Sequence, residues 1–241
     1  MSSSYRSAWR LWFLQSSWNR EGMQSLGFLV CLLPEARRRG LQGADLARWA
    51  RDRLGYFNTN PYLAGMIVGA TLHLDRSGRE EESLRLQKGL ASSLGALGDP
   101  FFWEGARPAV AYLGLSAAFL LGPIGILAAW ALFAIASGAI RELCLRLGVE
   151  RGPGVVDFLT RSWVHRSMSW ARAAAGLSCG LALALGFFTR WNAQFSPFAL
   201  ICALGALICG FLAAWRRWPL DRVLILATIL LWGILRSTSS M

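Results

Sequence analysis

The sequence predicts an all-α integral membrane protein with re-entrant or broken helices in its N-terminal half and two to four transmembrane helices. Two observations support this class. Hydrophobic residues make up 54% of the chain and charged residues only 16%, whereas soluble domains carry roughly 25% charged residues. The apolar residues are also gathered into runs, and residues 108–140 carry no charge at all. About 20 apolar residues cross a bilayer, so this run is long enough for one span.

The charge and the cysteines argue against several other classes. The net charge is +11, and arginines clustered beside apolar runs mark the cytoplasmic side of a membrane protein. No basic stripe alternates with aromatic residues in a polar domain, so no nucleic-acid binding is predicted. The five cysteines lack Cys-x-x-Cys spacing, which argues against a disulfide framework or a zinc site. We expect no metal, no cofactor and no cleaved signal peptide.

Residues 1–16 predict a helix that lies in the membrane interface. Trp9, Trp12 and Phe13 occur with two arginines at helical spacing, a pattern typical of interfacial helices; a frayed tail is the alternative. The next apolar run, 26–33, is too short to span a bilayer. It either enters the membrane and returns or packs on another subunit. Pro34 is expected to end it.

Two helices are expected next along the chain. Residues 44–57 predict an amphipathic helix with Trp49 on its apolar face. Asn60 before Pro61 is a polar cap followed by a proline at the first helical position. A second, apolar helix should therefore cover residues 61–74.

Small residues on this second helix predict tight packing. Gly65 and Gly69 lie four positions apart, so another helix can approach the backbone closely there. Residues 76–88, which are rich in charge, are expected to form a solvated connection.

The stretch from Gly98 to Pro108, at the start of the uncharged run, combines acidic and basic residues, three aromatic residues and two prolines. Asp99 before Pro100 predicts a helix start, and Arg107 before Pro108 predicts the end or a kink of that helix. Such a broken helix can aim free backbone groups at a polar substrate. Alternatively, it is a capped interfacial helix whose charges are solvated. The spacing of Glu104 and Arg107 predicts a salt bridge between them.

The C-terminal half is expected to cross the membrane repeatedly. The uncharged run predicts one tilted or kinked span, with the kink at Gly122 and Pro123. Further spans are expected at 173–189 and 198–215, and the run 223–235 either crosses or packs against a partner. The predicted organisation is an interfacial helix (1–16), a core with re-entrant helices and the first long span (17–140), an arginine-rich cytoplasmic segment (141–172) and C-terminal transmembrane helices (173–241).

Several motifs occur in an order that resembles a known family. They are Ser17-Trp18-Asn19 with Glu21, Met23, Gln24, Gly27 and Phe28; Phe57-Asn58-Thr59-Asn60-Pro61; Gly69-Ala70; Lys88-Gly89-Leu90 with Gly95, Gly98-Asp99-Pro100, Phe102-Trp103 and Arg107-Pro108; and Gly122-Pro123. With these blocks the chain resembles the IID membrane subunit of the mannose/fructose/sorbose family of the sugar phosphotransferase system. The resemblance covers residues 17–136, and the remainder is similar in hydropathy only.

The resemblance implies a mechanism divided among subunits. IIC and IID would form the path of a hexose-type sugar through the bilayer, while cytoplasmic IIA and IIB relay phosphate through their own histidines. This chain would be a non-phosphorylated, multi-pass subunit of a hetero-oligomer in the bacterial cytoplasmic (inner) membrane, and no enzyme by itself. His73 and His165 have no carboxylate directly beside them in the sequence, and we expect a structural or interfacial role for each.

Sugar hydroxyls are bound by dense hydrogen bonding, and polar groups inside a membrane are costly and gather at functional sites. The candidates for sugar contact, including one aromatic stacking surface, are Gln24, Asn58, Thr59, Asn60, Asp99 and Trp103. The residues expected to shape or cap helices are Pro61, Gly98, Pro100, Arg107 and Pro108. In the competing interpretation, the polar candidates only cap helices.

Two other functions stay open at this stage. Ser92-Ser93 stands where the family usually has Gly-Pro, and residues 190–197 are short where it has a sizeable polar segment. These departures motivate a second hypothesis, a non-transporting membrane scaffold or sensor that retains the IID fold. An enzyme acting on lipid-linked sugars would need Asp99 or Glu104 as its base. Support for this enzyme function would require activity of the isolated chain toward a lipid-linked sugar.

Overall fold

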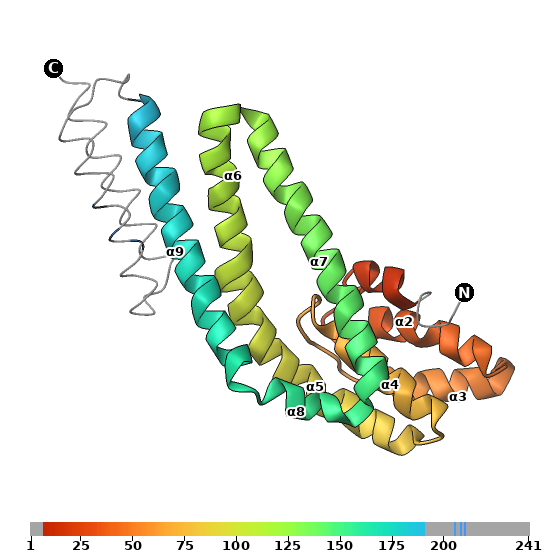
Figure 1. Cartoon of the computed structure of the whole chain (residues 1–241). Coiled ribbons are helices and arrows are strands. Elements are labelled where there is room, and N and C mark those ends of the chain that lie inside the picture. Colours follow the sequence, from red (N-terminus) through yellow and green to blue (C-terminus); the bar gives the residue numbers. More distant parts are fainter. Residues whose placement is uncertain (1–6, 191–204, 206–207, 209, 211–241) are drawn as a thin grey trace. The chain divides into compact units, whose positions relative to one another are not determined.

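The computed structural model describes residues 7–190 together with residues 205, 208 and 210. Over these residues its regular elements are helices (Figure 1), which confirms the predicted class. In chain order they are the 3₁₀-helix η1 (Trp9–Phe13), α2 (Ser25–Arg38), α3 (Gly43–Arg53), α4 (Ala64–Arg76), α5 (Glu80–Phe101), the π-helix η2 (Phe102–Ala106), α6 (Arg107–Leu121), α7 (Pro123–Arg151), the 3₁₀-helix η3 (Gly152–Gly154), α8 (Val155–Leu159) and α9 (Ser162–Arg190). The spans expected at 198–215 and 223–235 lie largely or wholly outside the described residues.

Two helical stretches of the described part are long and apolar enough to cross a membrane. They are Pro123–Leu159, with a mean hydropathy of 2.0, and Trp163–Gly186, with a mean hydropathy of 1.3. Only 11% of the most apolar window of Pro123–Leu159 is buried within the chain. A long apolar surface of this kind requires lipid or another protein around it.

The chain folds into two compact units. The first unit contains the described residues up to Asp99 together with Ala134–Val164. The second unit contains Pro100–Phe133 and the described residues from His165 onward. The chain therefore passes from one unit to the other within three helices, α5, α7 and α9.

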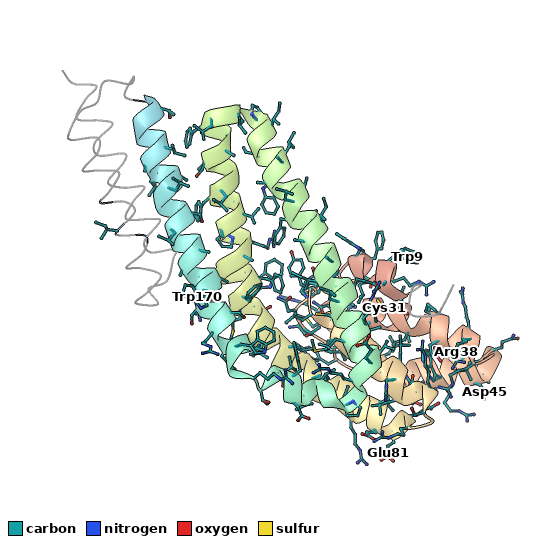
Figure 2. All side chains as sticks on the ribbon, in the orientation of Figure 1. Trp9, Cys31, Arg38, Asp45, Glu81 and Trp170 are labelled. Carbon is teal, nitrogen blue, oxygen red and sulfur yellow. The ribbon has the colours of Figure 1, made fainter. Side chains whose placement is uncertain are left out.

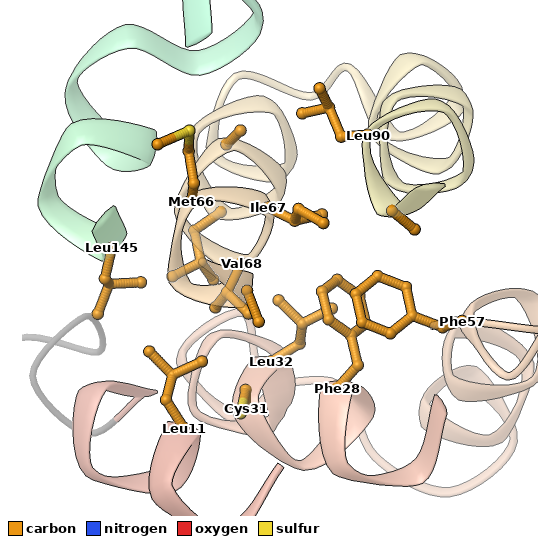
Figure 3. Packing of buried hydrophobic residues seen from close by; sticks show 14 of the residues in the cluster. Leu11, Phe28, Cys31, Leu32, Phe57, Met66, Ile67, Val68, Leu90 and Leu145 are labelled. Carbon is orange, nitrogen blue, oxygen red and sulfur yellow. The ribbon is translucent and has the colours of Figure 1, made fainter. Parts of the chain in front are cut away.

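The core of the first unit is built around α4. Nearly every side chain of α4 is buried, because this helix is apolar on all sides and other elements must surround it. Figure 3 shows the side chains that meet there, which include Leu11 of η1, Phe28 and Leu32 of α2, Ile67 of α4, Leu90 of α5 and Leu145 of α7.

Glycines bring α4 and α7 into backbone contact, as the spacing of Gly65 and Gly69 predicted. A Cβ added to Gly69 would lie 2.2 Å from the carbonyl oxygen of Leu145, and one added to Gly65 would lie 2.6 Å from that of Arg141. Gly148 faces them from α7, where a Cβ would lie 2.3 Å from the carbonyl oxygen of Met66. No larger residue fits at these three positions without separating the helices.

The expectation that Pro34 ends the second helix is wrong, because α2 continues through Pro34 to its end. A proline removes the hydrogen bond to the carbonyl four residues earlier, here that of Val30. Arg10 supplies the missing donor: its Nη1 donates to the Val30 oxygen at 3.2 Å. Ser7 Oγ donates to the adjacent carbonyl of Cys31 at 2.7 Å. The N-terminal segment thus satisfies the carbonyl that the proline leaves free.

The expected helix start at Asp99 is also wrong. α5 passes through Asp99 and Pro100 without interruption and is followed directly by the π-helix η2. α6 then begins at Arg107 with Pro108 in its first turn, where a missing N–H costs little. In η2 the N–H of Arg107 donates to the carbonyl oxygen of Phe102, five residues earlier, as the wider turn of a π-helix requires. The predicted break is therefore a local change of helix type.

The uncharged run forms a hairpin in the second unit and not the single tilted or kinked span that we expected. Gly122 has φ 66° and ψ −158°, a conformation that favours glycine. The chain reverses there, and α6 and α7 lie side by side (Figure 1). Small residues line their contact: a Cβ on Gly125 would lie 2.8 Å from the Cβ of Ala117, and one on Gly114 would lie 3.2 Å from that of Ala129.

Two further boundaries differ from expectation. The amphipathic helix α3 ends at Arg53, before residue 57, although Trp49 is buried in the core as predicted. Most of the expected charged connection 76–88 is helical, because α5 begins at Glu80 with three glutamates in its first turn. Negative charge there stabilises the N-terminal end of a helix. Residues 141–172 form the end of α7, η3, α8 and the start of α9; their cytoplasmic side stays a prediction.

Candidate functional site

The segment between α3 and α4 is the centre of the candidate site, and Phe57 anchors it. Phe57 is fully buried and its ring lies 4.1 Å from that of Phe28, centroid to centroid. The backbone N–H of Gln24 donates to the carbonyl oxygen of Phe57 at 2.9 Å, and the N–H of Phe57 donates to the carbonyl of Gly22 at 3.3 Å. These contacts fix the start of the polar sequence Asn58, Thr59, Asn60 on the N-terminal end of α2.

The side chain of Gln24 binds the next peptide unit of this segment. Its Nε2 donates to the carbonyl oxygen of Thr59 at 2.9 Å, and its Oε1 accepts from the N–H of Thr59 at 3.2 Å. The amide thus mimics a paired strand, satisfying both backbone groups of one residue, and it is 2% exposed. In this arrangement Gln24 positions the segment.

Asn60 joins the segment to the end of α5. Its Oδ1 accepts from the N–H of Tyr62 at 3.1 Å, and its Nδ2 donates to Oδ1 of Asp99 at 2.9 Å. The backbone carbonyl of Asn60 accepts from the N–H groups of Leu63 and Ala64. Asn60 therefore caps the turn through Pro61 that leads into α4. The helix itself begins at Ala64 and not at Pro61 as expected.

Gly98 makes the contact with Asn60 possible. A Cβ at Gly98 would lie 2.4 Å from the Cβ and 2.5 Å from the Cγ of Asn60. The absence of a side chain lets the buried asparagine pack against α5 and reach the carboxylate of Asp99, one residue further on.

The accessible polar groups of this cluster are on Asn58 and Asp99, which are exposed, whereas Thr59 and Asn60 are buried. The hydroxyl of Thr59 is also buried and has no hydrogen-bond partner in the described structure. An unpaired buried hydroxyl costs free energy. The cluster thus combines an exposed amide and carboxylate with one buried hydroxyl that lacks a partner.

The remaining candidates belong to the second unit. The guanidinium of Arg107 lies 4.4 Å from the ring centroid of Trp103, which is 37% exposed. The predicted Glu104–Arg107 pair is wrong: Glu104 forms its salt bridge with Arg172 of α9, at 3.3 Å. The i, i+3 rule assumes an α-helix, whereas Glu104 lies in the π-helix η2, and the guanidinium of Arg107 stacks on Trp103 instead.

Sequence reasoning missed Arg141 on α7. This side chain is 9% exposed and its guanidinium lies between two aromatic rings, 4.7 Å from the centroid of Trp12 and 4.4 Å from that of Tyr62. Its Nη1 donates to Oγ of Ser137 at 3.2 Å. The sequence feature that could have identified Arg141 is its position as the first charged residue after the uncharged run. Arg141 joins η1, α7 and the turn that follows Asn60.

His73 has the structural role that we expected. Its Nδ1 lies 2.8 Å from the carbonyl oxygen of Val149, so the ring links the end of α4 to the end of α7. His165 is exposed. Within the described residues, no group of three or more histidine, cysteine or acidic side chains is arranged to hold a metal ion.

Comparison with known proteins identifies the family. The family model described as the PTS system mannose/fructose/sorbose family IID component matches residues 2–184. The chain belongs to this family. The match includes every element of the candidate site, and it confirms the resemblance inferred from the motifs.

Curated members of the IID family are similar over part of their length. The mannose-specific EIID component of Escherichia coli (strain K12) is 34% identical over 149 residues, which cover 59% of this chain and 53% of that protein. The sorbose-specific EIID component of Lacticaseibacillus casei is 33% identical over 193 residues, which cover 75% of this chain and 64% of that protein. The aligned part of the chain thus spans between about half and two thirds of these relatives.

Two solved structures share the fold. One, described as the structure of a membrane protein, has a TM-score of 0.73 and 25% identity. The other is a cryo-EM structure of the mannose transporter ManYZ in complex with microcin E492, with a TM-score of 0.59 and 22% identity. Both likenesses cover 99% of this chain and 97% of the other chain. They show that this IID-family chain has the fold of a membrane protein.

Proposed function

We propose that this chain is the IID membrane subunit of a sugar phosphotransferase transporter. With a IIC subunit it forms the path of a hexose-type sugar across the bacterial inner membrane, as a multi-pass protein. IIA and IIB subunits supply the phosphate, so this chain carries no phosphorylated residue. Its membership of the IID family supports this assignment, as do curated relatives whose names specify mannose and sorbose.

The observation that carries the proposal is the polar cluster on a chain that is otherwise 54% hydrophobic. Asn58 and Asp99 present an amide and a carboxylate on accessible surface, backed by the buried Thr59 and Asn60. A sugar requires several convergent donors and acceptors of this kind. Polar groups in a membrane protein are retained where they serve a pathway or a site.

The contacts suggest different roles for the candidates. The amide of Gln24 and both polar ends of Asn60 are engaged within the protein, so these two residues hold the segment in place. Asn58 and Asp99 are assigned to the sugar hydroxyls. Trp103, which is 37% exposed, belongs to the second unit and is not part of this polar cluster.

The test is uptake by the Asn58→Ala variant of the chain, expressed with its partner subunits. Uptake should be lost while the amount of subunit in the membrane stays unchanged, because the Asn58 side chain is exposed. Gln42→Ala, which removes an exposed amide at the start of α3, is the matched control. Normal uptake by Asn58→Ala would remove this residue from the site, and loss of the subunit would assign it to folding.

A second experiment separates transport from the scaffold or sensor function. The full chain is purified gently from its native membrane, and the proteins that accompany it are identified by mass spectrometry. A stoichiometric polytopic partner of the IIC type supports the transporter. Recovery of the chain alone, or with unrelated proteins, favours the scaffold and leaves Asn58 and Asp99 without a sugar-binding role.

A further inference from the structure

A groove of about 280 Å³ lies between η1 and α7 in the first unit. Its lining comes from two segments: Ala8, Trp9 and Trp12 at η1, and Ile135, Gly138, Ala139 and Glu142 of α7. The groove is apolar except for the carboxylate at one end. It shares no residue with the polar cluster at Asn58.

The sequence of α7 places this groove where an apolar membrane segment gives way to charge. Residues 108–140 are uncharged, and Arg141 and Glu142 are the first charges after them. Arg141 stacks on Trp12 at 4.7 Å, and a Cβ on Gly138 would lie 2.6 Å from Trp12. These contacts hold Trp12 at the level of that transition. Tryptophan suits this level, because its ring is apolar and its N–H is polar, and it is enriched at the membrane–water interface.

The exposed surface beside the groove also suits the interface. Trp9, Trp12 and Phe13 are 54%, 51% and 55% exposed, and Ile135 is 70% exposed. Large apolar side chains in such number are costly in water and favourable against lipid.

The polar end of the groove carries both signs of charge. Glu142 accepts from Nε of Arg146 at 2.8 Å, and the Glu142 side chain is 33% exposed and that of Arg146 68% exposed. A phospholipid head group with a phosphate and an amine carries the charges complementary to this pair, an ammonium for Glu142 and a phosphate for Arg146. An apolar protein helix covering the groove would bury the carboxylate of Glu142, and the desolvation of that charge opposes it.

We propose that the groove binds one phospholipid whose head group carries an amine. The acyl chain lies along Ile135, Gly138 and Ala139, and the glycerol region lies between the two tryptophans. The head group stays at the water surface beside Glu142 and Arg146. This lipid would hold η1 at a fixed depth, and η1 in turn supplies Arg10 to the carbonyl that Pro34 leaves free.

The test is native mass spectrometry of the full chain, purified in mild detergent and incubated with equal amounts of phosphatidylethanolamine and phosphatidylglycerol. The unmodified chain should retain one phosphatidylethanolamine in preference to phosphatidylglycerol. Ala139→Trp should lose that adduct, because Ala139 is exposed on α7 and the added ring fills the groove. Ile124→Trp, at a 70% exposed position elsewhere on α7, should keep it.

Glu142→Gln provides a second variant that conserves shape. It should lower the preference for phosphatidylethanolamine over phosphatidylglycerol by about two- to fivefold, the effect expected of one partly exposed charge pair. Equal retention of the two lipids by the unmodified chain would overturn the proposal. So would an unchanged adduct in Ala139→Trp, which would place the lipid elsewhere on the surface.

Discussion

The buried ion pair between α3 and α4 allows a quantitative test of what holds the first unit together. Arg53 is 1% exposed and its Nη2 donates to both carboxylate oxygens of Asp75, at 2.9 and 2.8 Å. The guanidinium also stacks on Trp49 at 4.2 Å. The perturbation is Arg53→Met, which keeps the length and apolar stem of the side chain and removes its charge.

The expected loss is about 3–5 kcal/mol in the free energy of unfolding, because Asp75 is left buried with no cation beside it. That is a large share of the roughly 5–15 kcal/mol that stabilises a typical folded protein. Replacing both partners, as in Arg53→Met with Asp75→Leu, should restore much of the stability, since an apolar pair of similar volume often substitutes for a buried ion pair without loss.

The penalty should depend on pH in a defined direction. Burial raises the pKa of the Asp75 carboxyl, and the Arg53 guanidinium opposes that rise. In Arg53→Met the opposing charge is gone, so the pKa rises further. A raised pKa in the folded state favours folding at low pH, and that contribution is lost as pH rises through it. The deficit of the variant should therefore shrink as pH falls from neutral toward about 4, the range of an ordinary aspartate.

The assay is denaturant or thermal unfolding of the purified chain in detergent, followed by circular dichroism at several pH values. The two single variants and the double variant together form a mutant cycle. A loss below 1 kcal/mol for Arg53→Met would refute the reasoning, since it would mean that water or another group compensates Asp75. A deficit that grows as pH falls would refute the assigned direction of the pKa.

Two further predictions concern glycine contacts and use matched controls. Gly69→Val should separate α4 from α7 and cost about 1–3 kcal/mol or more in unfolding free energy, whereas Gly89→Ala, which meets nothing within 4 Å, should be neutral or stabilising by up to about 1 kcal/mol. Gly98→Ala should displace Asn60 from Asp99 and lower sugar uptake. Gly95→Ala lies about one turn earlier, its added Cβ would be 3.8 Å from the Cα of Thr59, and it should leave uptake unchanged. Equal uptake by both variants would mean that the Asn60–Asp99 bond is dispensable.

Features that depend on local composition could be predicted from the sequence. The low charge and the uncharged run at 108–140 predicted a helical membrane protein, and the spacing of Gly65 and Gly69 predicted a close helix contact. Asn60 before Pro61 predicted a capping side chain, and Asn60 does cap the turn that leads into α4, because cap chemistry involves only neighbouring residues. In each case the physical cause lies within one helix turn or one continuous run.

The prediction at Pro34 failed because a distant residue decides its outcome. Pro34 has the local properties of a helix end, yet Arg10, 20 residues before Val30 in the sequence, satisfies the carbonyl that the proline leaves free. Nothing within the window around Pro34 specifies this contact, so a rule based on proline alone predicts an end. At Asp99 and Pro100, α5 continues to Phe101 and η2 follows it directly, so the change of helix type comes after the proline.

In the candidate site, too, the sequence identified the polar residues but not the partners that they bind. The sequence identified Gln24, Asn58, Asn60 and Asp99 as unusual polar residues, and the structure brings three of them together around Thr59 through hydrogen bonds that span 35 and 39 positions. Those bonds distinguish residues that hold the segment from those that face outward. Asn58, which makes none of these bonds and is exposed, therefore becomes the residue whose substitution separates sugar contact from folding.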